Sequence, residues 1–107
     1  MRFEALEVSL SLIRSLRAPT QRLRTLDPDL YRQIRRAGSS IPLNLAEGST
    51  RTGKDRAHHF RVARGSAKEV QVALRSAEAW GDLQPKEIHA TLQTLDGLLR
   101  LLWGLTR

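Results

Sequence analysis

The chain has 107 residues, enough for one small domain with its own core, and we expect a single domain over residues 1–107. It has no cysteine, which excludes disulfide bonds and thiolate metal sites and favours a cytoplasmic protein. The formal net charge is +7, from 18 Lys and Arg against 11 Asp and Glu, and such a surplus attracts polyanions such as RNA or DNA.

The first predicted helix covers residues 2 to about 17. Apolar residues recur in it at spacings of three and four, as in a buried helix face: Phe3, Leu6, Leu10, Ile13 and Leu16. Val8 and Leu12 widen this face, which predicts burial against another subunit as well as the chain's own core. The pattern is amphipathic and unlike the plain apolar run of a signal peptide, so we expect no signal peptide.

Pro19 interrupts the helical hydrogen bonds that would follow the first helix, although Leu23 and Leu26 continue its apolar pattern. We expect one long helix kinked near Pro19, with two separate helices as the alternative.

The start of the second helix is marked by Asp27-Pro28-Asp29, since Asp is a favoured N-cap and Pro fits the first helical position. The helix should run to about residue 47 and stop at Gly48, which suits the left-handed position after a helix. Its apolar face contains Leu30, Ile34, Ala37, Ile41 and Leu45. Gly38 and Pro42 weaken a helix interior, so we expect a bend between them and a close approach of a neighbouring helix.

The third helix is expected from Lys54 to Trp80, ending at Gly81, and Thr52 and Asp55 have the spacing of a capping box at its start. Its buried face consists mainly of small residues, which predicts close helix packing. The members of this face are His59, Phe60, Ala63, Ser66, Ala67, Val70, Leu74 and Ala77.

The fourth helix should begin at Pro85 and carries two apolar stripes. One consists of Ile88, Leu92, Leu95, Leu99 and Leu102, and the other of Leu98, Leu101 and Leu105. This apolar area exceeds what a lone four-helix monomer needs, so we expect self-association.

Charges interrupt every leucine-rich stretch, so no segment is expected to span a membrane. Short loops make successive helices antiparallel neighbours, and the sequence therefore predicts an all-α, antiparallel up-down-up-down four-helix bundle.

Cations gather on one side of the third helix, opposite its small residues, within roughly 100° of arc. They are Lys54, Arg61, Arg64, Lys68 and Arg75, with Gln71 among them; the second helix adds Arg32, Arg35 and Arg36. Such faces match a surface that binds nucleic-acid phosphates. The alternative is an ordinary solvated face whose charge is reduced by Glu69 and Glu78.

No aromatic residue lies among these cations. Trp80 and Trp103 occupy positions that suit the core or a subunit contact. Base recognition in single strands is therefore not expected, and any contact with nucleic acid should be directed at the backbone.

The sequence offers no pattern for catalysis, a metal or a cofactor. His58 and His59 point about 100° apart on a helix, His89 has no partner at ligand spacing, and neither a P-loop nor a nucleophile elbow is present. We expect a non-enzymatic protein without metal or cofactor, in which His59 is a hydrogen-bonded core residue.

Asn44 and Glu47 stand near the end of the second helix, where the helix dipole disfavours a carboxylate. We interpret them as a structural polar clasp that fixes helix register, with Arg64 or the start of the third helix as the partner of Glu47. Replacing Glu47 by Ala should then lower thermal stability. The functional alternative is a catalytic carboxylate.

Three segments resemble the bacterial 23S rRNA intervening-sequence protein family. They are Gln33-Ile34-Arg35-Arg36-Ala37 followed by Ser40-Ile41-Pro42-Leu43-Asn44-Leu45-Ala46-Glu47-Gly48, then Phe60-Arg61-Val62-Ala63-Arg64-Gly65-Ser66-Ala67-Lys68-Glu69-Val70, and Trp80-Gly81-Asp82-Leu83. The resemblance implies a four-helix bundle that forms a homopentamer, and kinship with the basic, reverse-transcriptase-associated accessory proteins of diversity-generating retroelements. It implies no catalytic residues.

Together these observations favour a non-enzymatic, oligomeric, basic helical module that binds RNA or DNA backbones as an accessory factor, with a reverse transcriptase or another nucleic-acid enzyme as a possible partner. A protein-interaction scaffold with incidental charge is the main alternative. A small-molecule-binding bundle would need a cavity among the small residues of the second and third helices.

Overall fold

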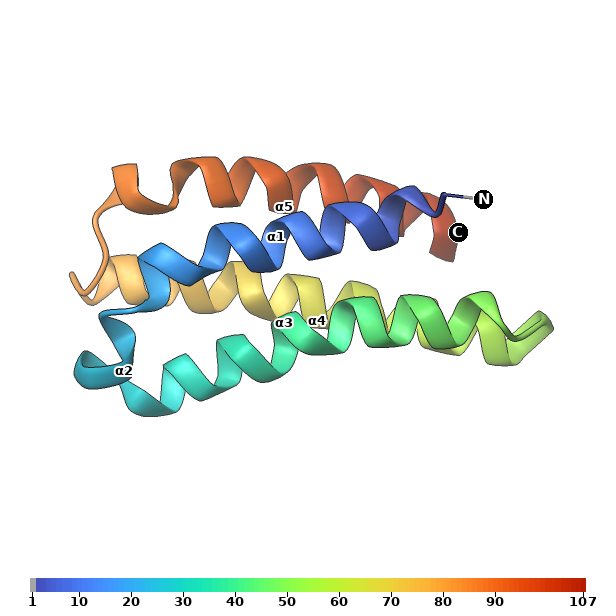
Figure 1. The fold of residues 1–107 in the computed structure, drawn as a ribbon, viewed down its shortest axis with the longest axis horizontal. Helices are drawn as coiled ribbons and strands as arrows, with labels where there is room; N and C mark the ends of the chain where they lie inside the picture. The colour runs from blue at the N-terminus through green and yellow to red at the C-terminus, as the bar shows by residue number, and fades with distance from the viewer. Residues whose placement is uncertain (1) are drawn as a thin grey trace.

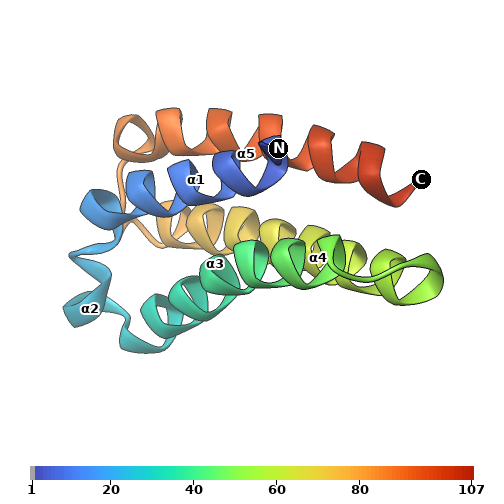
Figure 2. The same ribbon diagram turned by 45° about the vertical axis from the view of Figure 1, so that its right-hand side comes forward.

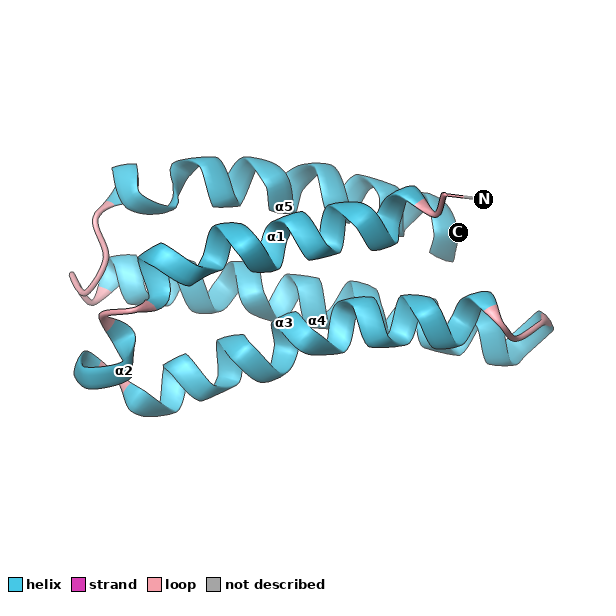
Figure 3. Ribbon diagram, in the orientation of Figure 1, coloured by secondary structure: helices cyan, strands magenta, loops and turns pink. Residues whose placement is uncertain are grey.

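The computed structural model describes residues 2–107; Met1, which the predicted domain 1–107 includes, lies outside them. The regular elements of the described residues are all helices: α1 (Glu4–Thr20), α2 (Leu23–Leu26), α3 (Pro28–Ser49), α4 (Gly53–Ala79) and α5 (Pro85–Thr106). No strand occurs in this part of the chain (Figure 3). The four long helices run alternately in opposite directions (Figure 1), which confirms the predicted up-down-up-down bundle.

The four long helices form a closed square in which each packs against its two neighbours. α3 contacts α4, α4 contacts α5, α5 contacts α1, and α1 contacts α3, while the short α2 packs on α3. The bundle measures 43 × 23 × 21 Å. The first turn of α1 and the C-terminus lie toward the side of the bundle away from α2 (Figure 1), and the turned view shows α2 and the loop between α3 and α4 at opposite ends (Figure 2).

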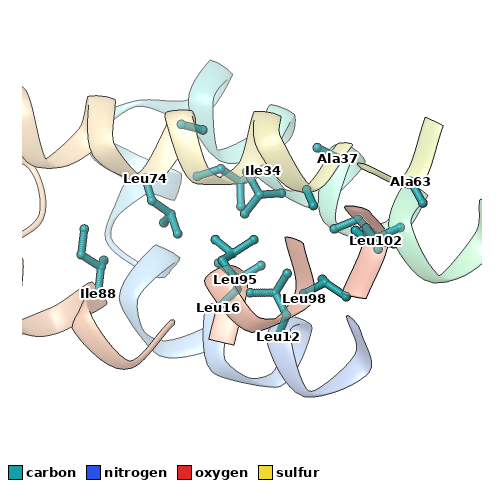
Figure 4. Packing of buried hydrophobic residues seen from close by; sticks show 14 of the residues in the cluster. Leu12, Leu16, Ile34, Ala37, Ala63, Leu74, Ile88, Leu95, Leu98 and Leu102 are labelled. Atoms are coloured by element: carbon teal, nitrogen blue, oxygen red, sulfur yellow. The ribbon is translucent and has the colours of Figure 1, made fainter. Parts of the chain in front are cut away.

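The core runs along the bundle axis and receives side chains from all four long helices (Figure 4). The buried residues of α1 are Ala5, Ser9, Leu12, Leu16, Pro19 and Thr20, whereas Leu6, Leu10 and Ile13 of the predicted face are only half-buried. The prediction is therefore right for Leu12 and Leu16, but the centre of the buried face is rotated toward Ala5 and Ser9. Ser9 can lie in the core because its hydroxyl donates to the Leu6 carbonyl.

The expectation of one long kinked helix through Pro19 is wrong, and the alternative of two helices is correct. α1 ends at Thr20, Gln21 and Arg22 form a turn, and α2 starts at Leu23. Pro19 has no amide hydrogen for the Ser15 carbonyl, which instead accepts a hydrogen bond from the Thr91 hydroxyl of α5 at 3.3 Å. The proline thus frees a carbonyl that joins α1 to α5.

Gly48 is not the left-handed stop that the sequence predicts. α3 continues unbroken through Gly38 and Pro42 to Ser49, and Gly48 is buried with helical backbone. A Cβ on Gly48 would lie 2.7 Å from Cε1 of Phe60 on α4, so this glycine is needed where α3 and α4 approach closely. The physical reason for the glycine is space between helices, not backbone conformation.

Of the two predicted ends of α4, the structure confirms the C-terminal one and contradicts the predicted cap at the N-terminal one. The Thr52 side chain makes no capping hydrogen bond, so the predicted capping box is wrong there, and Gly53 at the helix start has φ +58°. At the other end Gly81 has φ +84°, and the Asp82 amide donates to the Ala77 carbonyl at 2.9 Å, as in a Schellman motif. The predicted stop at Gly81 is confirmed.

Candidate nucleic-acid interface

Four of the predicted cations form a row along the solvent side of α4. Lys54, Arg61, Lys68 and Arg75 follow one another at intervals of seven residues, which is two helical turns or about 10.5 Å per step. All four are exposed, and no carboxylate of residues 2–107 lies within ion-pair distance of them. We call these four residues the cation row.

Acidic residues of α4 do not neutralise the cation row. Glu69 points toward α3, where its carboxylate lies 4.0 Å from the Arg36 guanidinium. Asp55 lies 4.0 Å from Arg51 in the preceding loop. Neither these carboxylates nor Glu78 forms an ion pair with the cation row among the described residues.

The remaining predicted cation of α4, Arg64, lies at the contact with α5. Its Nη1 donates to the Thr106 hydroxyl at 2.8 Å, and its guanidinium carbon lies 5.2 Å from the centre of the Trp103 ring. The Thr106 hydroxyl in turn donates to the Leu102 carbonyl. Arg64 is half-buried and held in place, unlike the members of the cation row.

The α3 arginines do not form one cluster. Arg32 pairs with Asp29 one turn earlier, and Arg35 lies 5.9 Å from the Tyr31 ring centre. Of the three, only Arg36 reaches toward α4, through Glu69. The structure therefore brings together the α4 cations but separates them from Arg32 and Arg35.

Asn44 contributes to a polar network that crosses from α3 to α4. Its amide nitrogen donates to the carbonyl and hydroxyl of Ser40, and its Oδ1 lies 3.0 Å from Nδ1 of His59. The Ser66 hydroxyl of α4 donates to the Ser40 hydroxyl at 2.9 Å. Because an amide oxygen can only accept, His59 carries its proton on Nδ1 in this arrangement.

Glu47 lies apart from this network and pairs with Arg51 in the loop after α3. Arg64 is not its partner. Arg51 also lies near Asp55 in the first turn of α4, so Glu47 is linked to α4 only indirectly, through this loop arginine. Arg56 of α4 donates to the carbonyl of Gly48 at 3.3 Å, in the last turn of α3, whose carbonyls lack helical partners.

Glu87 is the carboxylate whose pKa the structure shifts clearly. The backbone amide of Gln84 donates to it at 2.8 Å and Arg22 binds the same oxygen, so the pKa of Glu87 lies below its ordinary value. Arg22 also donates to the Asp82 carbonyl. This contact joins the α1–α2 turn to the start of α5 and belongs to the fold, not to the cation row.

Both tryptophans lie on the surface, so the predicted core position is wrong for each. Trp80 is 80% exposed and Trp103 57% exposed. Other large apolar side chains on the surface are Leu26, Leu43, Val72 and Leu105. The seven-residue interval of the cation row is visible in the sequence and could have predicted that these four side chains follow one another. The contact between Arg64 and Trp103 joins two helices, so no sequence pattern predicts it.

The described residues contain no cluster of three or more His, Asp or Glu side chains that could hold a metal ion. None of the helices in residues 2–107 is long and apolar enough to cross a membrane. The hollow beside Val72 and Lys68, between α3 and α4, is an open surface groove.

A comparison with known families covers nearly the whole bundle. A family model described as 23S rRNA-intervening sequence protein matches residues 4–104, from the first turn of α1 to the last turns of α5. No curated protein matches the chain.

Proposed function

Because this chain belongs to the 23S rRNA-intervening sequence protein family, we propose that it is a non-enzymatic helical bundle that binds the sugar–phosphate backbone of RNA or DNA as an accessory factor. The cation row is the observation that carries this proposal. Its four members are exposed, aligned and without ion-pair partners among the described residues. Cations arranged in this way contact phosphates without reading base sequence.

The length of the cation row matches an extended polyanion. From Lys54 to Arg75 the row spans 21 helical steps, or about 31 Å. One strand of a duplex carries a phosphate every 3.4 Å along the axis, so about nine base pairs lie beside the row. A rod of this length suits a nucleic acid better than a small anion.

Self-association forms part of the proposal. The half-buried Leu6, Leu10 and Ile13 of α1 and the exposed Leu43 of α3 remain apolar surface in a single subunit. We propose that copies of the chain cover this surface in a homo-oligomer, a pentamer by the resemblance. An oligomer multiplies the cation row and so strengthens binding by avidity. By the same resemblance, a reverse transcriptase or another nucleic-acid enzyme is the proposed protein partner.

Binding to labelled RNA and DNA as a function of salt tests this function. The proposal predicts micromolar or tighter binding at low salt and a steep fall of log affinity with log salt concentration. A scaffold with incidental charge would show no binding to either polymer at low salt. That outcome would contradict the proposal.

A further inference from the structure

Trp103 of α5 has one arginine against its ring and a hollow lined by two more arginines next to it. Arg64 of α4 covers one side of the ring at 5.2 Å from its centre. Arg100 and Arg107 lie one turn before and after Trp103 on the same helix and line the hollow with it. The residues that line this hollow all come from α5 and the residue that follows it, and Arg64 of α4 is not among them.

Arg64 connects this hollow to the cation row. On α4 it lies three residues after Arg61 and four before Lys68, so the three side chains are neighbours on one helix face. Arg64 thus contacts Trp103 and is at the same time a neighbour of two members of the cation row. The bond from Arg64 to Thr106 at 2.8 Å holds the guanidinium in place before any ligand arrives.

We infer that Trp103 is a stacking platform for an unpaired base, with Arg100 and Arg107 contacting the phosphates beside that base. This inference rests on the proposed function and specifies its ligand as a nucleic acid with single-stranded nucleotides. A half-exposed indole offers a π-face that every base can stack on, and neighbouring cations hold the strand against it. A base paired inside a duplex cannot reach this platform.

The composition of the hollow favours nucleic acid as its occupant. Arg100 and Arg107 line the hollow with the indole, Asp96 is the acidic side chain that lines it, and Arg64 lies against the ring. A purely apolar partner surface would leave Arg100 and Arg107 without counter-charges, whereas a nucleotide supplies both a ring and a phosphate.

The test compares a single-stranded oligouridylate with an RNA duplex of equal length, at one salt concentration, for four proteins. Trp103→Ala removes the platform, Trp103→Phe keeps an aromatic ring, and Trp80→Ala removes the other exposed indole as the matched control. The inference predicts about a tenfold or larger loss of oligouridylate affinity for Trp103→Ala, a smaller loss for Trp103→Phe, and duplex affinity within about twofold of the parent for all. Trp80→Ala should match the parent on both ligands.

A second readout follows the indole directly. In a Trp80→Phe background the fluorescence of Trp103 should be quenched by oligouridylate and not by the duplex. Unchanged affinity of Trp103→Ala for the single strand would overturn the inference, and the proposed function would stand if the duplex still bound. Absence of binding to either ligand by the parent protein would overturn the proposed function itself. A fall in oligomer mass on Trp103→Ala would also overturn the inference, because the indole would then be a subunit contact.

Discussion

Gly48 of α3 packs directly against the ring of Phe60 on α4, so closely that a Cβ on the glycine would lie 2.7 Å from Cε1 and 2.8 Å from Cδ1 of the ring. Phe60 is 6% exposed and packs on Phe3, with 6.0 Å between ring centres. The ring therefore has little room to move away.

Gly48→Ala should destabilise the protein by about 1–3 kcal/mol, because the added methyl overpacks this contact. Gly65→Ala is the matched control, since that glycine is exposed in the middle of α4 with open space around it. The control should raise stability by about 0.5–1 kcal/mol through the better helix propensity of alanine. Chemical denaturation measures both, and equal effects of the two changes would contradict the close-packing explanation.

Asn44→Ala should cost about 1–3 kcal/mol, because it leaves the ring nitrogen of His59 without its partner and removes one of the two hydrogen bonds to the Ser40 hydroxyl. Glu47→Ala should cost less than about 1 kcal/mol, because its ion pair with Arg51 is roughly half exposed on both sides. Thermal melts of the two variants, compared at one pH, check this order. A larger loss for Glu47→Ala would mean that the clasp depends on the carboxylate after all.

The lowered pKa of Glu87 predicts a specific pH dependence. A carboxyl whose pKa is lower in the folded state stabilises the fold above its unfolded value, here 4.5, and this contribution is lost as the pH falls through the folded value. Glu87→Gln should therefore lower the melting temperature at pH 7 and lower it progressively less below about pH 4.5. A difference that stays constant between pH 7 and pH 3 would refute this linkage.

Light scattering at micromolar concentration should give a mass that is a multiple of the 12.1 kDa subunit. Leu43 is 68% exposed on α3, so Leu43→Glu tests whether this surface is covered by another copy. If it is, the variant should shift to a smaller species while keeping its helical circular dichroism. A parent protein of 12.1 kDa would contradict the proposed self-association.

The sequence predicted helix ends correctly where a residue caps the helix or adopts a backbone conformation that favours that residue type. Asp27 caps α3 by accepting from the Leu30 amide, and Gly81 takes the left-handed conformation after α4. It predicted Gly48 wrongly because a glycine at a helix end and a glycine at a helix contact look alike in one dimension. Only the position of Phe60 on the partner helix distinguishes them.

The buried face of α1 escaped prediction because apolar residues surround most of that helix. Leu6, Leu10 and Ile13 have the spacing of a core face, yet the small residues Ala5 and Ser9 are buried with Leu12 and Leu16 instead. Both sets have helical spacing, so tertiary packing, and not local periodicity, decides which face is buried.

For the candidate interface, helical periodicity was sufficient to place the cations on one side of α4. It could not show that Arg64 reaches across to α5, because that contact depends on the position of Trp103 and Thr106 in space. For the same reason the sequence could not choose between a core position and a subunit contact for Trp103, and the structure contradicts only the core position, because the indole is exposed beside Arg64, Arg100 and Arg107.

The central claim is that the cation row, and not net charge in general, binds nucleic-acid backbone. The most direct measurement is the salt dependence of duplex DNA affinity for two variants that each lose four positive charges. One replaces Lys54, Arg61, Lys68 and Arg75 by Gln, and the control replaces the exposed Arg2, Arg14, Arg24 and Lys86 by Gln.

The cation-row variant should lose about tenfold or more affinity at low salt, and its log–log salt slope should fall by about 3–4, at ~0.9 per phosphate contact. The control should keep most of the parent slope. Equal losses in the two variants would show that binding follows net charge alone, and that result would contradict the account.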